Sequence, residues 1–227
     1  MKSHFTLLSE AEVEINISKS RFIGYATPVK DEDEAIVFIE KIKKKHWNAT
    51  HNVPVYVIGE NFNVQRYSDD GEPSGTAGVP ILEMLKKEEI TNVCIVVTRY
   101  FGGVKLGTGG LVRAYTQCAK AALEAGEVVE KRLNLLIMAS FDYHYHGKIQ
   151  NYIMNESGVL VRETRFTDKV EMAIYMDPEF KDVICSQLIE LTSNQVTLME
   201  ADEHFLTIKQ DEVLSAESKK GEVIWMR

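Results

Sequence analysis

The sequence predicts an α+β protein of two domains, and three observations lead to that prediction. The chain has 227 residues, which suits one large or two small domains. Strand and helix patterns are mixed in the first part, and the second part follows a β-α-β-β-α-β order. We place the first domain at 1–133, the second at 134–210 and a tail at 211–227.

Hydrophobic periodicity predicts the first elements of the first domain. Val13, Ile15 and Ile17 alternate with polar residues, as in a half-exposed strand. After a strand at 21–28, a helix opens on acidic residues at 31–34 and closes on Lys41 and Lys43–Lys45, charges that suit the two ends of a helix. We interpret these lysines as a solvated helix end rather than a binding patch. The further expected elements are strands at 53–59 and 63–68, a helix from about 78, a strand at 92–98, a helix at 110–125 and a strand near 127–132.

The second domain has a simpler order of elements. We expect strands at 135–143, 159–166, 170–176 and 195–209, with helices at 146–157 and 177–192. This order is the ferredoxin-like pattern. Residues after 210 are mostly polar and predict a loose tail.

The composition indicates in which cellular compartment the protein works. Its cysteines, Cys94, Cys118 and Cys185, are odd in number and far apart, which favours small core residues in a reducing compartment over a disulfide frame or zinc site. No apolar run approaches the roughly 18 residues of a membrane span, and the N-terminus lacks the apolar core of a signal peptide. We therefore expect a cytoplasmic protein with no membrane partner and no cofactor.

The net charge of −8 is unevenly distributed. Residues 1–133 carry 17 Lys and Arg against 18 Asp and Glu, a balance of −1, whereas residues 134–227 carry 9 against 16, a balance of −7. Proteins that bind nucleic acid are usually basic. A contact with nucleic acid must therefore be local and belong to the first domain, and we expect no reading of DNA sequence.

The segment 98–113 contains five glycines within nine positions: Gly102, Gly103, Gly107, Gly109 and Gly110. The spacing is not that of a P-loop, because Thr108 stands where that motif needs lysine, and Val112 replaces the third glycine of a dinucleotide fingerprint. A glycine-rich turn before a helix still exposes N–H groups to an anion. Two interpretations remain, a tight turn that lets the helix pack or a binding site, and we favour the second. The side chains that would complete this site are Arg99, Lys105 and Arg113 for charge and Tyr100 and Phe101 for an aromatic surface.

A second irregular segment, 68–78, carries Asp69, Asp70 and Glu72. Three acids in four residues suggest a divalent cation, but their pattern is not that of a calcium loop. We favour capping and turn formation, and pairing with Arg99 or Arg113 across the sheet end is a further option. Among the histidines, His51 is the one we keep as a site candidate.

Nucleophilic chemistry finds little support. Ser74 lies in no Gly-x-Ser-x-Gly turn, and Cys118 falls mid-helix on an apolar face. We assign no catalytic residue.

With these motifs in hand, the sequence resembles the IMPACT family, in particular its bacterial YigZ-like branch. The resemblance rests on Ala49-Thr50-His51, on the run from Ser68 to Gly78, and on Thr98-Arg99-Tyr100-Phe101-Gly102-Gly103 followed by Leu106-Gly107-x-Gly109-Gly110-Leu111-x-Arg113-Ala114. It implies a first domain with the fold of ribosomal protein S5 domain 2 and a second similar to the C-terminal part of elongation factor G. Eukaryotic members regulate translation under stress by competing with an initiation-factor kinase for its activator. These members carry an extra N-terminal domain. We expect this chain, with no room for that domain, not to share the kinase role.

The resulting hypothesis is a non-enzymatic, translation-associated regulator that binds RNA, the ribosome or a protein partner through the glycine-rich surface. The alternatives are a metal-dependent hydrolase or phosphotransferase that uses Asp69, Asp70, Glu72 and His51, and a protein-interaction module anchored on Tyr100 and Phe101. The candidate binding residues are His51, Asp69, Asp70, Glu72, Ser74, Thr76, Arg99, Tyr100, Phe101, Gly102, Gly103, Lys105, Gly107, Gly109, Gly110 and Arg113.

Overall fold

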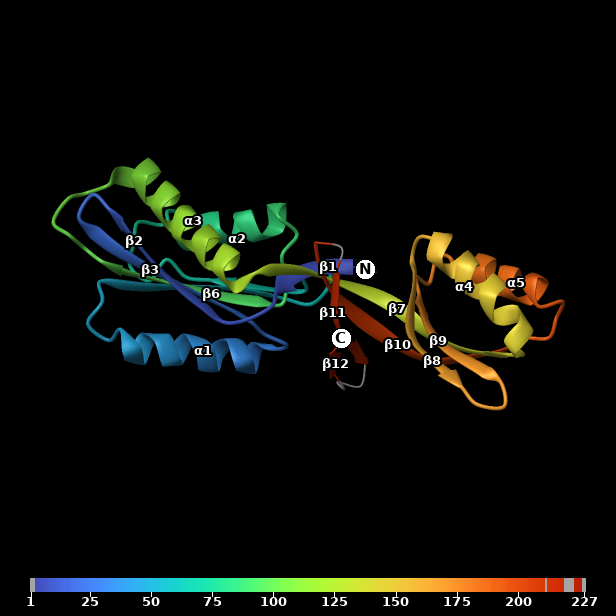
Figure 1. The fold of residues 1–227 in the computed structure, drawn as a ribbon. Helices are drawn as coiled ribbons and strands as arrows, with labels where there is room; N and C mark the ends of the chain where they lie inside the picture. The colour runs from blue at the N-terminus through green and yellow to red at the C-terminus, as the bar shows by residue number, and fades with distance from the viewer. Residues whose placement is uncertain (1–2, 211, 219–222, 226–227) are drawn as a thin grey trace. The chain divides into compact units, whose positions relative to one another are not determined.

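A computed structural model describes residues 3–210, 212–218 and 223–225, and the chain divides into two compact units, 3–130 and 131–227 (Figure 1). The mixed α+β class is confirmed. The division falls within one strand, β7 (Val128–Phe141). The prediction of two strands around residue 133 is therefore wrong. No glycine or proline interrupts residues 128–141, and Asn134 is accommodated in the strand with its side-chain amide bonded to the Arg132 carbonyl.

The first unit is built on an antiparallel sheet with the strand order β2-β3-β6-β4-β5. Every residue of the central strand from Val93 to Arg99 is buried, because helices cover both faces of the sheet (Figure 1). The bounds are β2 (Ala11–Ile17), β3 (Ser20–Pro28), β4 (His51–Ile58), β5 (Val64–Tyr67) and β6 (Val93–Tyr100). A first strand, β1 (Ser3–Leu7), was not predicted.

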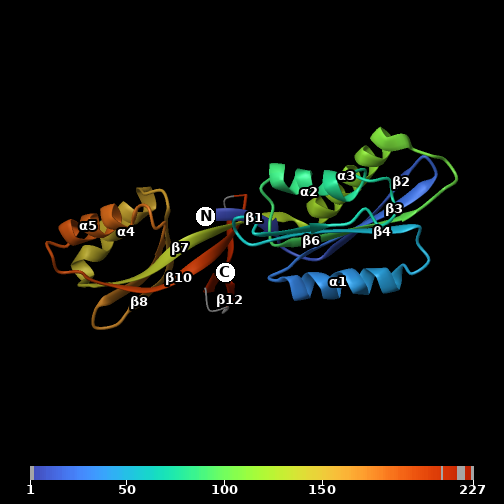
Figure 2. The same cartoon turned by 180° about the vertical axis from the view of Figure 1, so that it is seen from behind.

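Helix α1 (Glu32–Lys45) covers one face, and α2 (Gly78–Lys87) and α3 (Gly107–Gly126) cover the other (Figure 2). The apolar side chains of α1 pack against Tyr25 and Val96. The inner face of α3 carries small side chains and approaches the sheet closely: a Cβ on Gly24 would lie 2.8 Å from the Cys118 carbonyl oxygen. This close packing fixes the position of α3 over β3.

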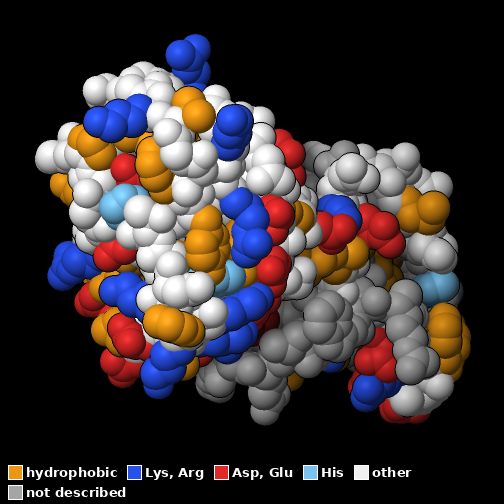
Figure 3. All heavy atoms as spheres, turned by 90° about the vertical axis from the view of Figure 1, so that its left-hand side faces the viewer, with side chains coloured by type: hydrophobic (Ala, Val, Ile, Leu, Met, Phe, Trp, Pro, Cys, Tyr) orange, Lys and Arg blue, Asp and Glu red, His pale blue; other side chains and the backbone are white. Residues whose placement is uncertain are grey.

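The directions of the strands bring several segments to one end of the first sheet. β2 and β6 end there, β3 and β4 begin there, α1 finishes there and α3 starts there, as the pairs Arg21↔Tyr100 and His51↔Arg99 show. We call this the loop end and define it by residues 18–19, 44–50 and 101–113. It contains the glycine-rich segment and faces the viewer in Figure 3.

The second unit follows the predicted order of elements, and its strands lie in the order β10-β7-β9-β8. Apolar residues of α4 and α5 pack on the same face of that sheet (Figure 2). The bounds are η1 (Tyr143–Tyr145), α4 (His146–Asn155), β8 (Val159–Phe166), β9 (Val170–Met176), α5 (Lys181–Leu191) and β10 (Thr197–Lys209).

The prediction of a loose tail at 211–227 is wrong for the residues of this segment that the structure describes. β11 (Glu212–Ser218) pairs antiparallel with β10, and β12 (Val223–Trp225) pairs with β11. The polar composition of β11 does not indicate a strand, because its serines are buried and form hydrogen bonds within the fold. Ser215 is buried and donates to the Thr207 hydroxyl at 3.0 Å, while Ala216 packs opposite Leu206.

Candidate functional site

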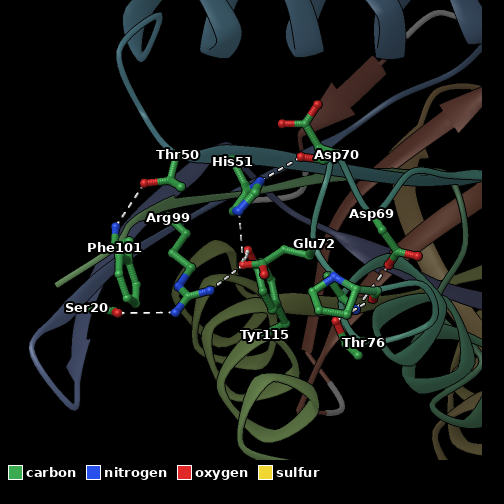
Figure 4. A network of polar contacts seen from close by, with 12 residues as sticks. Ser20, Thr50, His51, Asp69, Asp70, Glu72, Thr76, Arg99, Phe101 and Tyr115 are labelled. Carbon is green, nitrogen blue, oxygen red and sulfur yellow. Dashed lines mark hydrogen bonds and ion pairs between the residues drawn. The ribbon is translucent and has the colours of Figure 1, made fainter. Parts of the chain in front are cut away.

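A buried ion pair joins the acidic 68–78 segment to the central strand. Arg99 on β6 donates from Nη1 to Oε1 of Glu72 at 2.5 Å, and the two side chains are 5% and 4% exposed. Tyr115 on α3 donates its hydroxyl to the same oxygen at 2.8 Å (Figure 4). Burial, with the Glu72 carboxylate beside it, raises the pKa of Tyr115. Of the two pairings left open by the sequence, with Arg99 or with Arg113, the structure shows the one with Arg99, and Glu72 connects a loop, a strand and a helix.

The rest of the Arg99 guanidinium also faces inward. Its Nη2 donates to the Ser20 hydroxyl at 3.3 Å, and its centre lies 5.3 Å from the Phe22 ring and 5.5 Å from the Phe101 ring. Its Nε has no hydrogen-bond partner within the residues that the structure describes. Arg99 therefore organises the base of the glycine-rich segment and adds no charge to its surface.

His51 stands between the two irregular segments. Its Nδ1 lies 2.7 Å from the Asp70 carbonyl oxygen, which only accepts, so we assign the ring proton to that nitrogen. Its Nε2 lies 3.7 Å from Oε1 of Glu72. Protonation of Nε2 would give Glu72 a second positive partner.

The aspartates of the 68–78 segment are engaged by backbone amides. The carboxylate of Asp69 accepts from the N–H groups of Gly75, Ala77 and Gly78 at 2.8, 3.1 and 2.8 Å. Asp70 accepts from the N–H of Asn52 at 2.6 Å. These contacts confirm the capping interpretation, because Asp69 occupies the N-terminus of α2. Throughout the described ranges, no cluster of three His, Cys, Asp or Glu side chains has an arrangement suited to a metal ion.

The two hydroxyl candidates of this segment behave differently. Thr76 is buried and donates to the Pro73 carbonyl at 2.7 Å, which closes the turn. Ser74 is exposed.

The glycine-rich segment is fixed at its start and open beyond it. Phe101 donates its N–H to the Thr50 hydroxyl at 3.0 Å, and Gly102 donates to the Ser20 hydroxyl at 3.3 Å. A Cβ on Gly102 would fall 1.8 Å from the Lys19 carbonyl oxygen, so the position requires glycine. Gly103 has a φ of +86° and open space around it.

α3 begins at Gly107, three residues before the predicted start at Gly110. The prediction treated all five glycines as a turn, but glycine costs little in a first turn whose N–H groups have no intrahelical partner. Its N-cap residue is Leu106, which has no polar side chain; the first turn contains no acidic residue, and none of the described side chains accepts a hydrogen bond from its N–H groups. Gly109, like Gly107, is exposed and has open space around it.

Two exposed cations flank this helix start. Lys105 and Arg113 form no ion pair with any described residue, although Nε of Arg113 donates to the Gly109 carbonyl at 3.2 Å. The uncapped amides and the two cations together make a positive surface. The N-terminus of α2, in contrast, is neutralised by Asp69.

The two aromatic candidates have separate roles. The hydroxyl of Tyr100 lies 2.8 Å from Nδ1 of His46 and donates to Asn48 at 3.3 Å, and Arg21 stacks on the ring at 4.7 Å. Tyr100 is half-buried in this arrangement, whereas Phe101 is 45% exposed. Phe101 is therefore the one that offers an apolar face to a partner.

Sequence reasoning missed Ser20 and Tyr115. Ser20 anchors both Arg99 and Gly102, but a serine in a short turn carries no distinguishing signal. The Tyr115 ring lies on the apolar face of its helix and packs edge-on against Phe22. A buried tyrosine hydroxyl needs a partner, and that requirement was the available signal.

The fold and the site define a class: a two-unit α+β protein with a glycine-rich surface held in place by a buried ion pair. The model of the Impact N-terminal domain matches residues 18–123, and that of a domain of unknown function (DUF1949) matches residues 140–195. IMPACT family member YvyE of Bacillus subtilis is 46% identical over 206 residues, which cover 91% of this chain and 94% of that protein. The chain belongs to the IMPACT family.

Two further comparisons agree with this assignment. IMPACT family member YigZ of Escherichia coli is 37% identical over 132 residues, covering 57% of this chain and 64% of that protein. A crystal structure of a hypothetical protein superposes with a TM-score of 0.56 at 26% identity, over 89% of this chain and 98% of that one. In the part of the chain that the structure describes, no helix combines the length and apolar character needed to span a membrane.

Proposed function

We propose that the protein is a non-enzymatic, translation-associated regulator that binds its partner through the surface formed by residues 101–110 and Arg113. The partner would be RNA, the ribosome or a translation-related protein, in the cytoplasm. Membership of the IMPACT family supports the link to translation. The likeness of the units to ribosomal protein S5 domain 2 and to the ferredoxin-like part of elongation factor G belongs to the same proposal, and the strand order β10-β7-β9-β8 supports its second half.

One observation carries the proposal: among the described residues, the start of α3 has no side-chain cap and its two flanking cations have no ion-pair partner, while the neighbouring acids bond within their own part of the fold. Glu72 is paired with Arg99, whereas Asp69 and Asp70 keep their charge and are held by backbone N–H groups of Gly75, Ala77, Gly78 and Asn52. Among the described residues none of these acids pairs with Lys105 or Arg113, so both cations are available to a partner. Such a surface attracts the phosphates of RNA or an acidic face of a protein.

A co-sedimentation and capture experiment tests this function. Ribosomes, total RNA and tagged translation factors are each incubated with the protein at low and moderate salt. We expect at least one to be retained, and we expect Lys105→Ala with Arg113→Ala to lose most of that retention. Arg99→Ala is a poor probe because it leaves Glu72 buried without its partner.

The matched control is Lys87→Ala with Lys120→Ala, which removes two exposed lysines from α2 and α3 away from the loop end. Retention should survive in this variant. If none of the three partners is retained, or if both double variants lose retention equally, the proposed function fails.

A further inference from the structure

Trp47 is the most exposed large apolar side chain in the described part of the chain, at 83%. It follows the last turn of α1, at the loop end. Large aromatic side chains are normally buried, because each one left in water forgoes a substantial hydrophobic gain. An indole this exposed therefore needs a reason other than the stability of its own fold.

The backbone that carries Trp47 is held firmly in place. The preceding residue, His46, lies with Nε2 2.6 Å from the Tyr25 hydroxyl and Nδ1 2.8 Å from the Tyr100 hydroxyl. The following residue, Asn48, accepts from Tyr100, and the N–H of Ala49 donates to the His46 carbonyl at 3.0 Å. An exposed ring on a fixed backbone is preorganised for binding, since less freedom is lost when a partner arrives.

The same contacts connect Trp47 to the glycine-rich segment. Tyr100 immediately precedes Phe101, and Phe101 donates its N–H to Thr50 three residues after Trp47. Two exposed aromatic rings, Trp47 and Phe101, therefore project from segments that are bonded to each other. Figure 3 shows hydrophobic side chains interspersed with Lys and Arg over this end of the first unit.

The charges at this end are predominantly positive and uncompensated. Lys19 in the β2–β3 turn, Lys44 at the end of α1, Lys105 and Arg113 are all exposed, and within the described ranges none of them forms an ion pair. Neighbouring Lys45 is different, because it pairs with Glu12 at 2.7 Å. Four segments thus contribute a free cation around two aromatic rings.

We propose that the loop end is a binding surface for single-stranded RNA, on which Trp47 and Phe101 stack unpaired bases and the four cations contact phosphates. This inference rests on the proposed function and names the class of its partner. Aromatic faces with interspersed cations are the combination that holds single strands, because every base offers a ring face and every linkage a negative charge. A duplex hides its base faces and would use the cations alone.

The assignment also changes the interpretation of the lysines that close α1. The sequence pattern favoured a solvated helix end, which remains adequate for Lys41 and Lys45, since they pair with Glu10 and Glu12. Lys44 forms no ion pair with any residue that the structure describes, and it precedes Trp47 by three positions. It belongs to the proposed RNA surface.

Trp47 supplies its own spectroscopic probe. The chain has two tryptophans, so Trp225→Phe leaves Trp47 as the sole one. This variant is titrated with a twelve-nucleotide oligoadenylate while tryptophan fluorescence is recorded. We expect quenching that saturates, because a stacked adenine quenches indole emission. Binding should weaken with salt, with a log–log slope of about −0.7 for each phosphate contacted.

Variants of the loop end are compared by the anisotropy of fluorescein-labelled oligoadenylate, with Trp225 kept. Trp47→Ala should weaken binding roughly 10- to 100-fold, which corresponds to the loss of one stacked base. Its melting temperature should match that of the parent, because the removed side chain lies in water. Lys44→Ala should reduce the salt slope by about 0.7, and Lys87→Ala, a matched exposed lysine at the other end of the first sheet, should not change it.

Several results would overturn the RNA assignment. They are no binding of the oligonucleotide, full affinity in Trp47→Ala, tighter binding of a twelve-base-pair RNA duplex, and equal binding of polyglutamate, which would show that charge alone is recognised. If these occur while ribosomes or a protein factor are still retained through Lys105 and Arg113, the proposed function stands and this inference fails. If that retention is also lost, both fail.

Discussion

At the scale of single residues, Arg99 and Glu72 depend on each other for charge compensation. Both side chains are buried, and the Glu72 carboxylate also receives the Tyr115 hydroxyl. Removing one member of a buried ion pair leaves the other charged and desolvated, which is far more costly than losing a pair in water. The pair is thus the part of the candidate site on which folding depends most.

We expect Glu72→Gln to destabilise the first unit by about 3 kcal/mol, because the Arg99 charge loses its counter-ion. Urea unfolding followed by tyrosine fluorescence or circular dichroism measures the loss. Glu83→Gln is the control, since Glu83 pairs with Lys86 at an exposed position and should change stability by less than about 1 kcal/mol. Equal losses in the two variants would contradict the structural role assigned to Glu72.

His46 makes the stability of the first unit depend on pH. Burial lowers the pKa of His46 below its ordinary value of 6.5, and Lys45 and Arg21 add to this, whereas Glu12 opposes it. The unfolded chain therefore takes up a proton near pH 6.5 while the folded chain does not, and stability falls as the pH decreases through that value. The groups around the ring are Tyr25, Tyr100, Glu12, Lys45 and Arg21.

We expect the parent to lose stability between pH 7.5 and pH 5.5 faster than His46→Gln does, by at most about 1.4 kcal/mol per pH unit, since one proton is involved. Urea unfolding at a series of pH values gives both curves. Glu12 acts in a separate window: its hydrogen bond with Lys45 lowers the pKa of Glu12 from 4.5, so its contribution is lost only under more acidic conditions. Parallel curves for parent and variant above pH 5.5 would exclude His46 as the source.

At the scale of elements, the glycine-rich segment and the β2–β3 turn fit together as one unit. Gly102 and Gly103 are neighbours, but different constraints act on them. Gly102 has no room for a Cβ beside the Lys19 carbonyl, whereas Gly103 has room but adopts a left-handed φ of +86°. One position is restricted by contact with another segment and the other by its own backbone.

We therefore expect Gly103→Ala to cost about 1 kcal/mol, the strain of a non-glycine residue in that conformation. Gly102→Ala should cost at least twice as much, because either the turn or the segment must move. Chemical unfolding of the two variants makes the comparison. If Gly103→Ala proves the costlier, the close contact between residues 19 and 102 is not a constraint on the fold.

At the scale of the whole molecule, the hydrophobic clusters follow the division into two units. The clusters built on β6 include residues no later than Leu123, and those built on β9 include none before Leu135. Separate cores predict separate opening events, even though β7 belongs to both units.

Ile184→Ala tests this independence, since Ile184 on α5 is buried in the second core. We expect a loss of about 2–4 kcal/mol from the second unit, because the shortened side chain leaves a cavity. Amide hydrogen exchange resolved by peptide mass spectrometry should show faster exchange in β9 and β10 and unchanged exchange in β6. Faster exchange in both units would mean that they unfold together.

The sequence predicted the elements that carry their own periodicity and end signals. The alternation at Val13, Ile15 and Ile17 and the charged ends of α1 were sufficient to place those elements. It did not predict β11, because its serines are polar although they are buried in the fold. It did not predict the single strand β7, because polar Asn134 lies between the two shorter strands that were expected.

Within the candidate site, nothing in the sequence indicates which way a charged side chain faces. Arg99 and Arg113 look equivalent beside the glycines, yet one lies in the core and the other in water. That difference depends on Glu72 and Ser20, which reach Arg99 from remote parts of the chain. Trp47 went unnoticed for the same reason, since exposure is a property of the fold.

The arrangement of charge in the first unit also governs how fast a partner arrives. α1 alone separates the acids at its start from the lysines at its end by about 20 Å, and the helix macrodipole, which has the opposite sense, offsets only a small part of this separation because it amounts to about half a charge at each end. A unit whose charges nearly cancel can still turn in the field of an approaching polyanion and present its cationic end before contact is made. Its association rate would then respond to ionic strength as that of a strongly basic protein does, although the chain as a whole is acidic.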